Sequence, residues 1–255
     1  MQVCYFASDF HLGAPSKEQS NERERAIVRW LDYAATDATD IYLVGDVFDF
    51  WFEYAAVIPK GYSRFFGKLA ELADRGIQLH FFYGNHDMWV KQYFTDEFGM
   101  KIYANPIQLT LYGKRIYLGH GDGLGPGDRG YKFIKLFLRS TLCQWAFARI
   151  HPNFGIGLAR FFSGKSREGS EHEHQFLGFE HEWLYQFVQA MQQKDPHDYY
   201  IFGHRHLPFS LPIERGTYFN LGEWFHYQTF MKIDSEIPQY FTWDGHSASS
   251  YDPPY

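Results

Sequence analysis

The chain has few cysteines and lacks a long hydrophobic run. Cys4 and Cys143 are far apart among its 255 residues, which excludes a disulfide framework and predicts reduced thiols, as in a cytoplasmic protein. No uncharged apolar run approaches the roughly 20 residues needed to cross a bilayer. The first residues, MQVCYFASDF, lack a basic start and a cleavage pattern, so we expect no signal peptide. The composition, 45% hydrophobic and 21% charged, is globular.

Acidic residues are missing from one long stretch. Between Arg129 and Arg167 there is no Asp or Glu, and eight Lys and Arg residues give this stretch a charge of +8. The whole chain carries −6, so the remainder carries −14. A basic block of this size indicates an anionic partner.

Apolar periodicity predicts strands that alternate with helices, and then mostly strands. Expected helices cover 22–35, 61–76 and about 180–193. Expected strands cover 2–8, 41–44, 77–83, a hairpin over 107–118, 198–202 and several short strands between 209 and 243.

This order of elements predicts a mixed α/β fold in which helices cover the sheet. The segment 123–180 breaks the rhythm, because it begins GLGPGDRG and is then basic and aromatic. We interpret it as an inserted helical cap. The core is then formed by 1–122 and 181–245, and 246–255 is expected to be a loose tail.

Five short polar motifs each follow a predicted strand. They are SDFH, GDVFD, GNHD, GHGD and GHRH. Binding sites in open α/β sheets form at the loops that follow the carboxyl ends of the strands. All five motifs are therefore expected to meet at one edge of the sheet. Any one of them alone is compatible with a turn, a helix cap or solvated side chains. Their recurrence at strand ends favours a single shared site.

The side chains of these motifs suit a pair of divalent ions. They offer carboxylate, amide and imidazole donors and no thiolate, which favours manganese, iron or zinc. Two ions about 3.5–4 Å apart need a shared ligand, and Asp46 is the candidate bridge. The other predicted ligands are Asp9, His11 and His206 for one ion, and Asn85, His120 and His204 for the second.

The remaining polar residues of the motifs are expected around these ligands. Asp49, Asp87 and Asp122 are interpreted as carboxylates that orient the ligands. His86 is expected to meet the charge of a transition state or to protonate a leaving oxygen, so His86 and Asp46 are the predicted catalytic residues. Two ions and two liganding carboxylates leave the site positive, as a phosphate ester requires.

In this order the motifs D-x-H, GD-x-x-D, GNH, GH and GH-x-H resemble the calcineurin-like metallophosphoesterase family. They extend from Asp9 to His206, which is most of the chain. The resemblance implies a four-layer αββα sandwich, a dinuclear metal centre, with manganese expected, and hydrolysis of phosphoesters by metal-activated water.

Within that family the chain is similar to the UDP-2,3-diacylglucosamine diphosphatases of lipid A synthesis. SDFHLG, GDVFDFW, HGDGL and LGEW are close to their motifs, whereas GNHD departs from the GNRD of many members. The similarity implies a lipid-linked nucleotide sugar as substrate and UMP as one product. The implied substrate contacts are Asn85, His86 and Asp128, with Lys165 and Arg167 as candidates for a cation of the cap.

The basic and aromatic segment fits an amphiphilic substrate. Its apolar side chains either form a cap core or line a slot for acyl chains, at about 0.8 kcal/mol per buried methylene. Its cations would face phosphates or the anionic inner-membrane surface, which predicts a cytoplasmic protein peripheral to that membrane. Nucleic acid is not expected, because the rest of the chain is acidic. A soluble nucleotide-type diester as substrate, and a non-catalytic binding module, remain alternatives, and the oligomeric state is left open.

Overall fold

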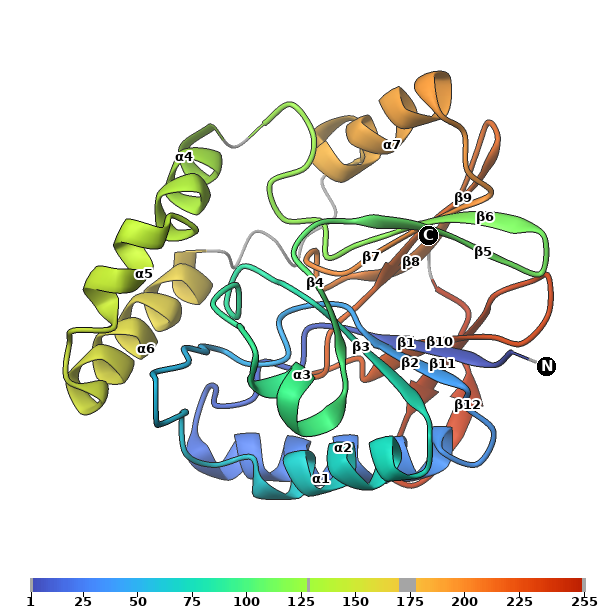
Figure 1. The fold of residues 1–255 in the computed structure, drawn as a ribbon. Coiled ribbons are helices and arrows are strands. Elements are labelled where there is room, and N and C mark those ends of the chain that lie inside the picture. Colours follow the sequence, from blue (N-terminus) through green and yellow to red (C-terminus); the bar gives the residue numbers. More distant parts are fainter. Residues whose placement is uncertain (1, 128, 170–177, 254–255) are drawn as a thin grey trace.

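Two β-sheets form the centre of the molecule in a computed structural model that describes residues 2–127, 129–169 and 178–253 (Figure 1). The first sheet holds β1 (Cys4–Ala7), β2 (Asp40–Leu43), β3 (Gln78–Phe82), β4 (Lys101–Tyr103), β10 (Thr229–Ile233), β11 (Gln239–Trp243) and β12 (Ala248–Ser250). The second holds β5 (Ile107–Leu111), β6 (Lys114–Leu118), β7 (Tyr199–Phe202), β8 (Pro208–Ile213) and β9 (Gly216–Leu221).

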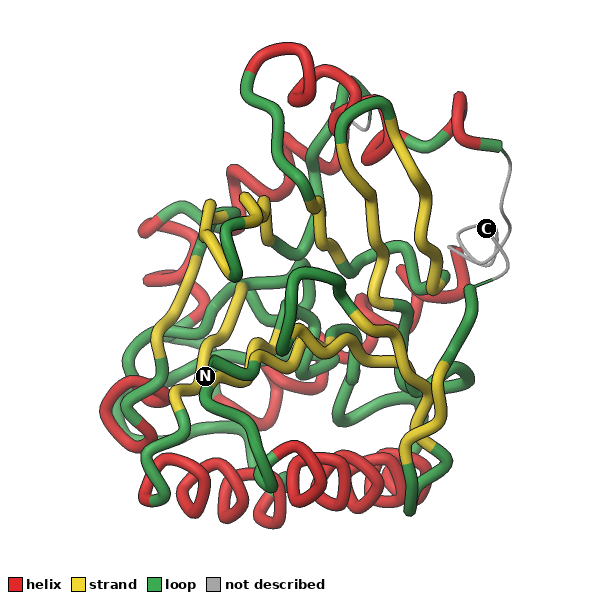
Figure 2. The backbone as a smooth tube through the Cα atoms, turned by 90° about the vertical axis from the view of Figure 1, so that its right-hand side faces the viewer, coloured by secondary structure: helices red, strands yellow, loops and turns green. Residues whose placement is uncertain are grey.

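Helices cover the outer faces of both sheets. Those described are α1 (Lys17–Ala34), α2 (Ser63–Asp74), α3 (Tyr93–Phe98), α4 (Arg129–Leu138), α5 (Thr141–Phe147), α6 (Pro152–Gly169), η2 (Phe179–His181) and α7 (Trp183–Lys194). Helices α1 and α2 lie under the first sheet and α7 lies over the second, while α4, α5 and α6 stand to one side (Figures 1 and 2). This arrangement confirms the predicted mixed α/β fold with four αββα layers.

The strands that precede the polar motifs run parallel within each sheet. The first sheet has the order β12-β11-β10-β1-β2-β3-β4, in which β1, β2, β3 and β4 are parallel. The second has the order β5-β6-β7-β9-β8, in which β6, β7 and β9 are parallel. The carboxyl ends of β1, β2 and β3 therefore lie at one edge of the first sheet, and those of β6 and β7 at one edge of the second.

Three apolar layers hold these elements together. Between the sheets, Phe6, Val44 and Ile201 belong to one buried cluster. Trp30 of α1 and Phe65 of α2 pack under the first sheet. The third layer joins α7 to the second sheet. Because both faces of β1 are covered, its sequence CYFA is buried throughout, as expected of a central strand that packs into one core cluster on each face.

Some predicted boundaries were wrong for reasons outside the local apolar pattern. Helix α1 begins at Lys17 and not near residue 22, because the Ser16 hydroxyl accepts a hydrogen bond from the Gln19 amide and caps the helix start. The tail is not loose throughout, since β12 pairs with β11 and the Tyr251 amide donates to the Tyr240 carbonyl. Helix α3 and strand β4 were not predicted.

Helices α4, α5 and α6 lie within the segment expected to be an insertion. Neither α4 nor α5 contains a buried residue. Their base reaches the core where Leu138 and Phe147 pack beside buried Phe52 and Trp89. The Trp89 indole also donates to the Leu138 carbonyl at 2.8 Å.

Two further predictions concern the whole chain. Cys4 is buried in β1 and Cys143 lies in α5, and both thiols are free, as expected. Among the described residues, no helix is both long and apolar enough to cross a membrane.

Candidate metal centre

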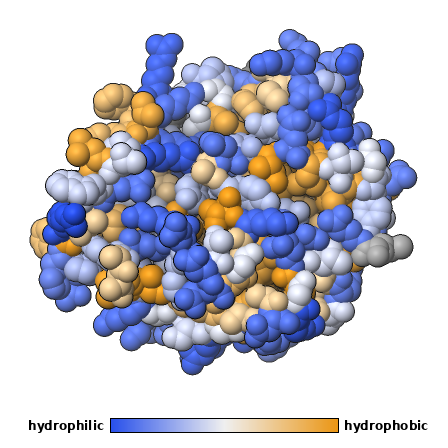
Figure 3. All heavy atoms as spheres, viewed as in Figure 1, coloured by the Kyte–Doolittle hydropathy of each residue, from blue (hydrophilic) through white to orange (hydrophobic). Residues whose placement is uncertain are grey.

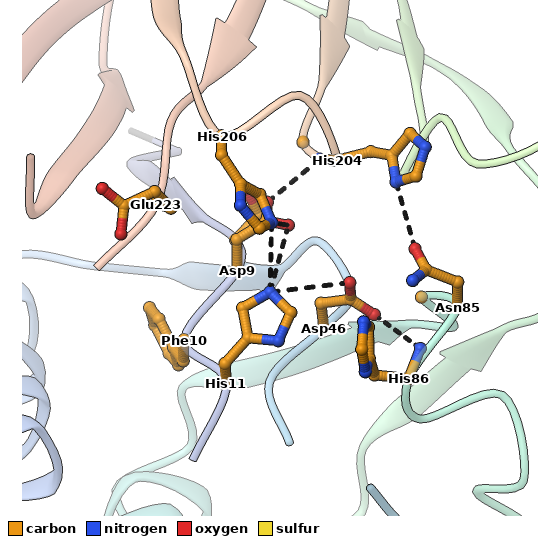
Figure 4. Close-up of polar contacts among 12 residues, drawn as sticks. Asp9, Phe10, His11, Asp46, Asn85, His86, His204, His206 and Glu223 are labelled. Atoms are coloured by element: carbon orange, nitrogen blue, oxygen red, sulfur yellow. Dashed lines mark hydrogen bonds and ion pairs between the residues drawn. The ribbon is translucent and has the colours of Figure 1, made fainter. Parts of the chain in front are cut away.

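Four of the predicted ligands point toward one another (Figure 4). His11 Nε2 lies 3.1 Å from His206 Nε2, 3.7 Å from Asp46 Oδ2 and 3.8 Å from Asp9 Oδ1. His206 Nε2 is 3.2 Å from the same Asp9 oxygen. One donor atom from each of these residues lies within 4.8 Å of the others, which is compact enough to hold one ion.

A second group of donors adjoins the first. Asn85 Oδ1 lies 3.2 Å from His120 Nε2 and 3.0 Å from His204 Nδ1. His120 Nε2 is also 3.4 Å from Asp46 Oδ2. Asp46 is therefore the carboxylate common to both groups, which is the geometry expected of a bridging ligand.

The protonation of these side chains fits a cation between them. The Val44 carbonyl, 2.9 Å from His120 Nδ1, can only accept a hydrogen bond. His120 therefore carries its proton on Nδ1 and directs the Nε2 lone pair at the second group. Asp9 Oδ1 is buried and faces the Nε2 atoms of His206 at 3.2 Å and His11 at 3.8 Å. An ion at this position would satisfy these lone pairs together.

The pKa shifts of the donor residues also indicate that positive charge is favoured between them. Burial opposes the charge of Asp46, yet the facing His120 and His86 imidazoles hold its pKa well below the usual carboxyl range. Burial alone would lower the pKa of His120, but the Asp46 carboxylate, with smaller effects of Asp9 and Asp122, raises it to about 10. Both shifts show that these donors favour positive charge at the place where they meet.

The backbone at the ligands adopts an unusual conformation. Positive φ angles are found at Asp9 (56°), His11 (43°), Asp46 (51°), His204 (70°) and His206 (56°). A residue other than glycine pays about 1–3 kcal/mol for such a conformation, and strain of this kind collects at functional sites. Aspartate and histidine are among the residue types that tolerate it best.

Glycines let the loops approach at backbone distance. A Cβ atom at Gly84 would lie 2.1 Å from Asp46 Oδ1, and one at Gly203 would lie 2.5 Å from Asp9 Oδ2. The Gly in GNHD and the Gly in GHRH are therefore required for the carboxylates to reach the centre.

Asp87 and Asp49 lie behind the ligands. The Asp87 carboxylate accepts from the Val47 and Gly84 amides at 2.8 Å each, so it ties the GDVFD loop to the GNHD loop. Burial, followed by the nearby charge of Asp46, raises the pKa of Asp87 to about 7. The Asp49 carboxylate lies 3.8 Å from His11 Nδ1. Both carboxylates are placed to orient the loops that carry the ligands.

Asp122 faces the helices beside the core. It accepts a hydrogen bond from the Tyr131 hydroxyl at 2.6 Å and pairs with Lys135 Nζ at 2.6 Å, and both partners belong to α4. Asp122 therefore connects α4 to the loop that carries His120. Sequence reasoning missed Tyr131 and Lys135, because nothing in their local pattern identifies a partner in GHGD.

His86 is anchored through one ring nitrogen. Its Nδ1 lies 3.1 Å from the Asp49 carbonyl and 3.0 Å from the Ser163 hydroxyl of α6. Its backbone amide donates to Asp46 Oδ1 at 2.9 Å. The anchoring of Nδ1 leaves Nε2 as the ring nitrogen available to a substrate. Ser163 was also missed from the sequence.

Arg23 is a further residue that sequence reasoning did not identify. Its buried guanidinium donates to the carbonyls of Phe10 at 2.6 Å and His11 at 2.8 Å, and it stacks over the Phe225 ring at 4.1 Å. It therefore holds the SDFH loop in place from α1. The sequence did contain one signal for this role, since Arg23 lies on the apolar face of the predicted helix.

Three predicted substrate contacts cannot be placed. Asp128 and the side chains of Lys165 and Arg167 lie outside the described residues. Their roles stay predictions.

The convergence of these loops agrees with comparisons to known proteins. The calcineurin-like phosphoesterase family model matches residues 4–208. The chain belongs to this family, which confirms the family and the hydrolase class predicted from the motifs.

Curated relatives make the comparison more specific. A protein of Porphyromonas gingivalis named UDP-2,3-diacylglucosamine hydrolase is 36% identical, over 94% of both chains. One of the same name from Aeromonas hydrophila is 30% identical, over 86% of this chain and 90% of its own. Among solved structures, vacuolar protein sorting 29 from Cryptosporidium parvum has a TM-score of 0.50 at 10% identity, covering 98% of this chain and 95% of its own. At that identity the likeness concerns the fold alone.

Proposed function

We propose that this chain hydrolyses the pyrophosphate of UDP-2,3-diacylglucosamine to UMP and 2,3-diacylglucosamine 1-phosphate. The observation that carries the proposal is the convergence of all seven predicted ligands, with Asp46 common to both groups. The names of the curated relatives support the choice of substrate.

The donor set fits two divalent ions, and manganese is the metal we expect. Asp9, His11 and His206 would hold one ion, Asn85, His120 and His204 the other, and Asp46 both. Bound ions of this kind lower the pKa of a water molecule and neutralise charge on phosphate oxygens.

The protein supplies orientation and a proton. Contacts at Nδ1 with the Asp49 carbonyl and the Ser163 hydroxyl hold the His86 ring. When the ring is in its imidazolium form, Nε2 can donate a proton or a hydrogen bond to a phosphate oxygen or the leaving group. Held in this way, the ring needs little reorganisation during the reaction.

The helices beside the core would receive the lipid part of the substrate. Exposed fractions are 73% for Phe133, 60% for Phe137, 58% for Trp145 and 66% for Phe154. These values oppose the interpretation that such side chains form the core of a cap. Figure 3 shows apolar patches among polar residues on the side of the molecule where α4, α5 and α6 stand. Exposed apolar area of this kind marks a ligand or membrane contact.

The basic charge of the same segment supports a location at an anionic membrane surface. Lys132 and Arg139 belong to the stretch without acidic residues that carries +8. Each cation near such a surface contributes about 1 kcal/mol. We therefore propose that the protein works in the cytoplasm as a peripheral protein of the inner membrane.

The direct test is UMP release from UDP-2,3-diacylglucosamine in mixed micelles with Mn²⁺. The proposal expects turnover that depends on Mn²⁺ and exceeds turnover of soluble phosphodiesters. Efficient turnover of the soluble diesters with none of the lipid substrate would reject the substrate. Fewer than two bound ions after reconstitution would indicate a binding module.

A further inference from the structure

An ion pair joins the loop of the last two histidines to the start of α7. Arg205 lies between His204 and His206 in the sequence. Its Nε is 2.7 Å from Glu182 Oε2 and its Nη2 is 2.5 Å from Glu182 Oε1. Glu182 is 4% exposed. Two parallel charge-assisted bonds fix the direction of a guanidinium as well as its position.

The loop needs such an anchor because its backbone is strained. Both histidines that flank Arg205 have positive φ angles, 70° for His204 and 56° for His206. On the sheet side, the His204 amide donates to Asp9 Oδ2 at 3.0 Å. The Arg205 side chain provides a fixed point outside the sheet. Together these contacts set the positions of two side chains that belong to different groups of donors.

Glu182 is itself held where two segments cross. It follows η2 and precedes α7, where the chain returns from the helices beside the core. The outgoing segment packs against the next residue, because a Cβ atom at Gly125 would lie 2.3 Å from the Trp183 carbonyl oxygen and one at Gly127 2.0 Å from the Trp183 ring. The partner of Arg205 is thus part of a closely packed crossing.

We propose that Arg205 and Glu182 form a positioning pair for the metal centre. The pair holds the GHRH loop so that His204 and His206 each face their own group of donors. It also connects that loop to the root of α4, α5 and α6. Neither residue touches the reacting atoms, and the role does not depend on the substrate.

The experiment measures Mn²⁺ binding to the metal-free full-length protein by isothermal titration calorimetry. The variants are Arg205→Gln, Arg205→Lys, Glu182→Gln and the double variant Arg205→Gln/Glu182→Gln. Loss of a residue that orients metal ligands weakens metal binding by about 10–100-fold. We expect this rise in Kd for both ions in Arg205→Gln and Glu182→Gln, a smaller rise in Arg205→Lys, and no additional rise in the double variant.

The matched control removes another arginine–carboxylate pair of the second sheet. Arg115 Nη2 lies 2.7 Å from Asp195 Oδ1, and Arg115 lies near the start of β6, at the opposite end of this strand from His120. Arg115→Gln is expected to leave both Kd values unchanged.

The proposal is overturned if folded Arg205→Gln binds both ions with the Kd of the parent protein. It is equally overturned if the melting temperature of the metal-free protein falls while both Kd values stay constant, since the pair then supports only the fold. If Arg205→Gln does not fold, Glu182→Gln and Arg205→Lys decide by the same criterion. If the parent protein releases no UMP but Arg205→Gln binds Mn²⁺ more weakly than the parent, the proposed substrate is rejected and the role of the Arg205–Glu182 pair is retained.

Discussion

Asp46 illustrates how one residue joins contacts from several loops. Its Oδ1 accepts the His86 amide, while its Oδ2 lies near His120 and His11. The residue is almost fully buried, so its charge is balanced only by what surrounds it. The role of Asp46 in the metal centre therefore depends on the charge of its side chain as well as on its shape.

Replacement of Asp46 by asparagine keeps the volume and removes the charge. We expect bound Mn²⁺ to fall below two per chain and kcat to fall by at least about 10²–10³-fold. Elemental analysis and steady-state kinetics measure the two effects. Asp32→Asn, at an exposed residue of α1, is the matched control. Retention of two ions and full activity would contradict the bridging assignment.

His86 gives a second prediction at the residue scale. His86→Gln should retain two bound ions, because His86 is not among the predicted ligands, and should lower kcat by about 10²–10⁴-fold. If His86 protonates the leaving group, the substitution should lower kcat for a p-nitrophenyl phosphodiester much less, since the leaving group of that substrate needs no proton. Equal losses on both substrates would favour a purely electrostatic role.

At the scale of elements, helix starts are stabilised by distant carboxylates. Glu53 accepts the Lys91 amide at 2.8 Å and the Gln92 amide at 2.9 Å, so it caps the start of α3. Glu24 of α1 accepts the Arg64 and Phe65 amides in the same way at the start of α2. These contacts link elements that the chain order leaves apart.

Glu53→Gln should therefore destabilise the fold without changing metal affinity. Loss of a charged cap at a buried position is expected to cost about 1–3 kcal/mol. Urea unfolding monitored by circular dichroism measures the free energy of unfolding. Glu97→Gln, at an exposed residue within α3, serves as control and should change it by less than about 0.5 kcal/mol.

The exposed apolar residues of α4 and α5 lead to a prediction about substrate choice. Phe137→Ser or Trp145→Ser should raise KM for the acylated substrate and leave KM for a small soluble phosphodiester unchanged. Ile237→Ser, at a position that is 72% exposed outside these helices, is the control. Similar effects on both substrates would argue that these side chains support the helices and do not contact acyl chains.

For the molecule as a whole, charge is divided between two regions. The stretch from Arg129 to Arg167 carries +8 and the remainder −14. A membrane with anionic lipids would attract the first region and repel the second, which would orient the protein with α4, α5 and α6 toward the surface.

Vesicle co-sedimentation tests this orientation. Vesicles that contain phosphatidylglycerol should bind the protein, and binding should weaken as NaCl rises from 50 to 500 mM because the Debye length shortens. Phosphatidylcholine vesicles should bind less. Lys132→Glu/Arg139→Glu should reduce binding to the anionic vesicles, whereas Lys194→Glu, in α7, should not. Equal binding to both vesicle types would contradict the electrostatic contribution.

Much of the fold could be predicted because strand patterns and motif positions are local. The runs around β1, β2, β3 and β7 were recognised from their apolar residues, and each was followed by its polar motif. Helix α3 was missed because it has six residues and takes its cap from Glu53, about 40 positions earlier. The start of α1 was misplaced because its first turns are polar, and the only local signal of where the helix begins is the cap at Ser16.

The sequence by itself determined the class of chemistry, since the residue types in five short motifs decide which donors are available. Tertiary structure decided which atoms meet: the position of Asp46 in both donor groups, the anchoring of His86 by Ser163, and the pairing of Asp122 with α4. These contacts join residues far apart in the chain. Their distances follow from how sheets and helices pack, which no local pattern encodes.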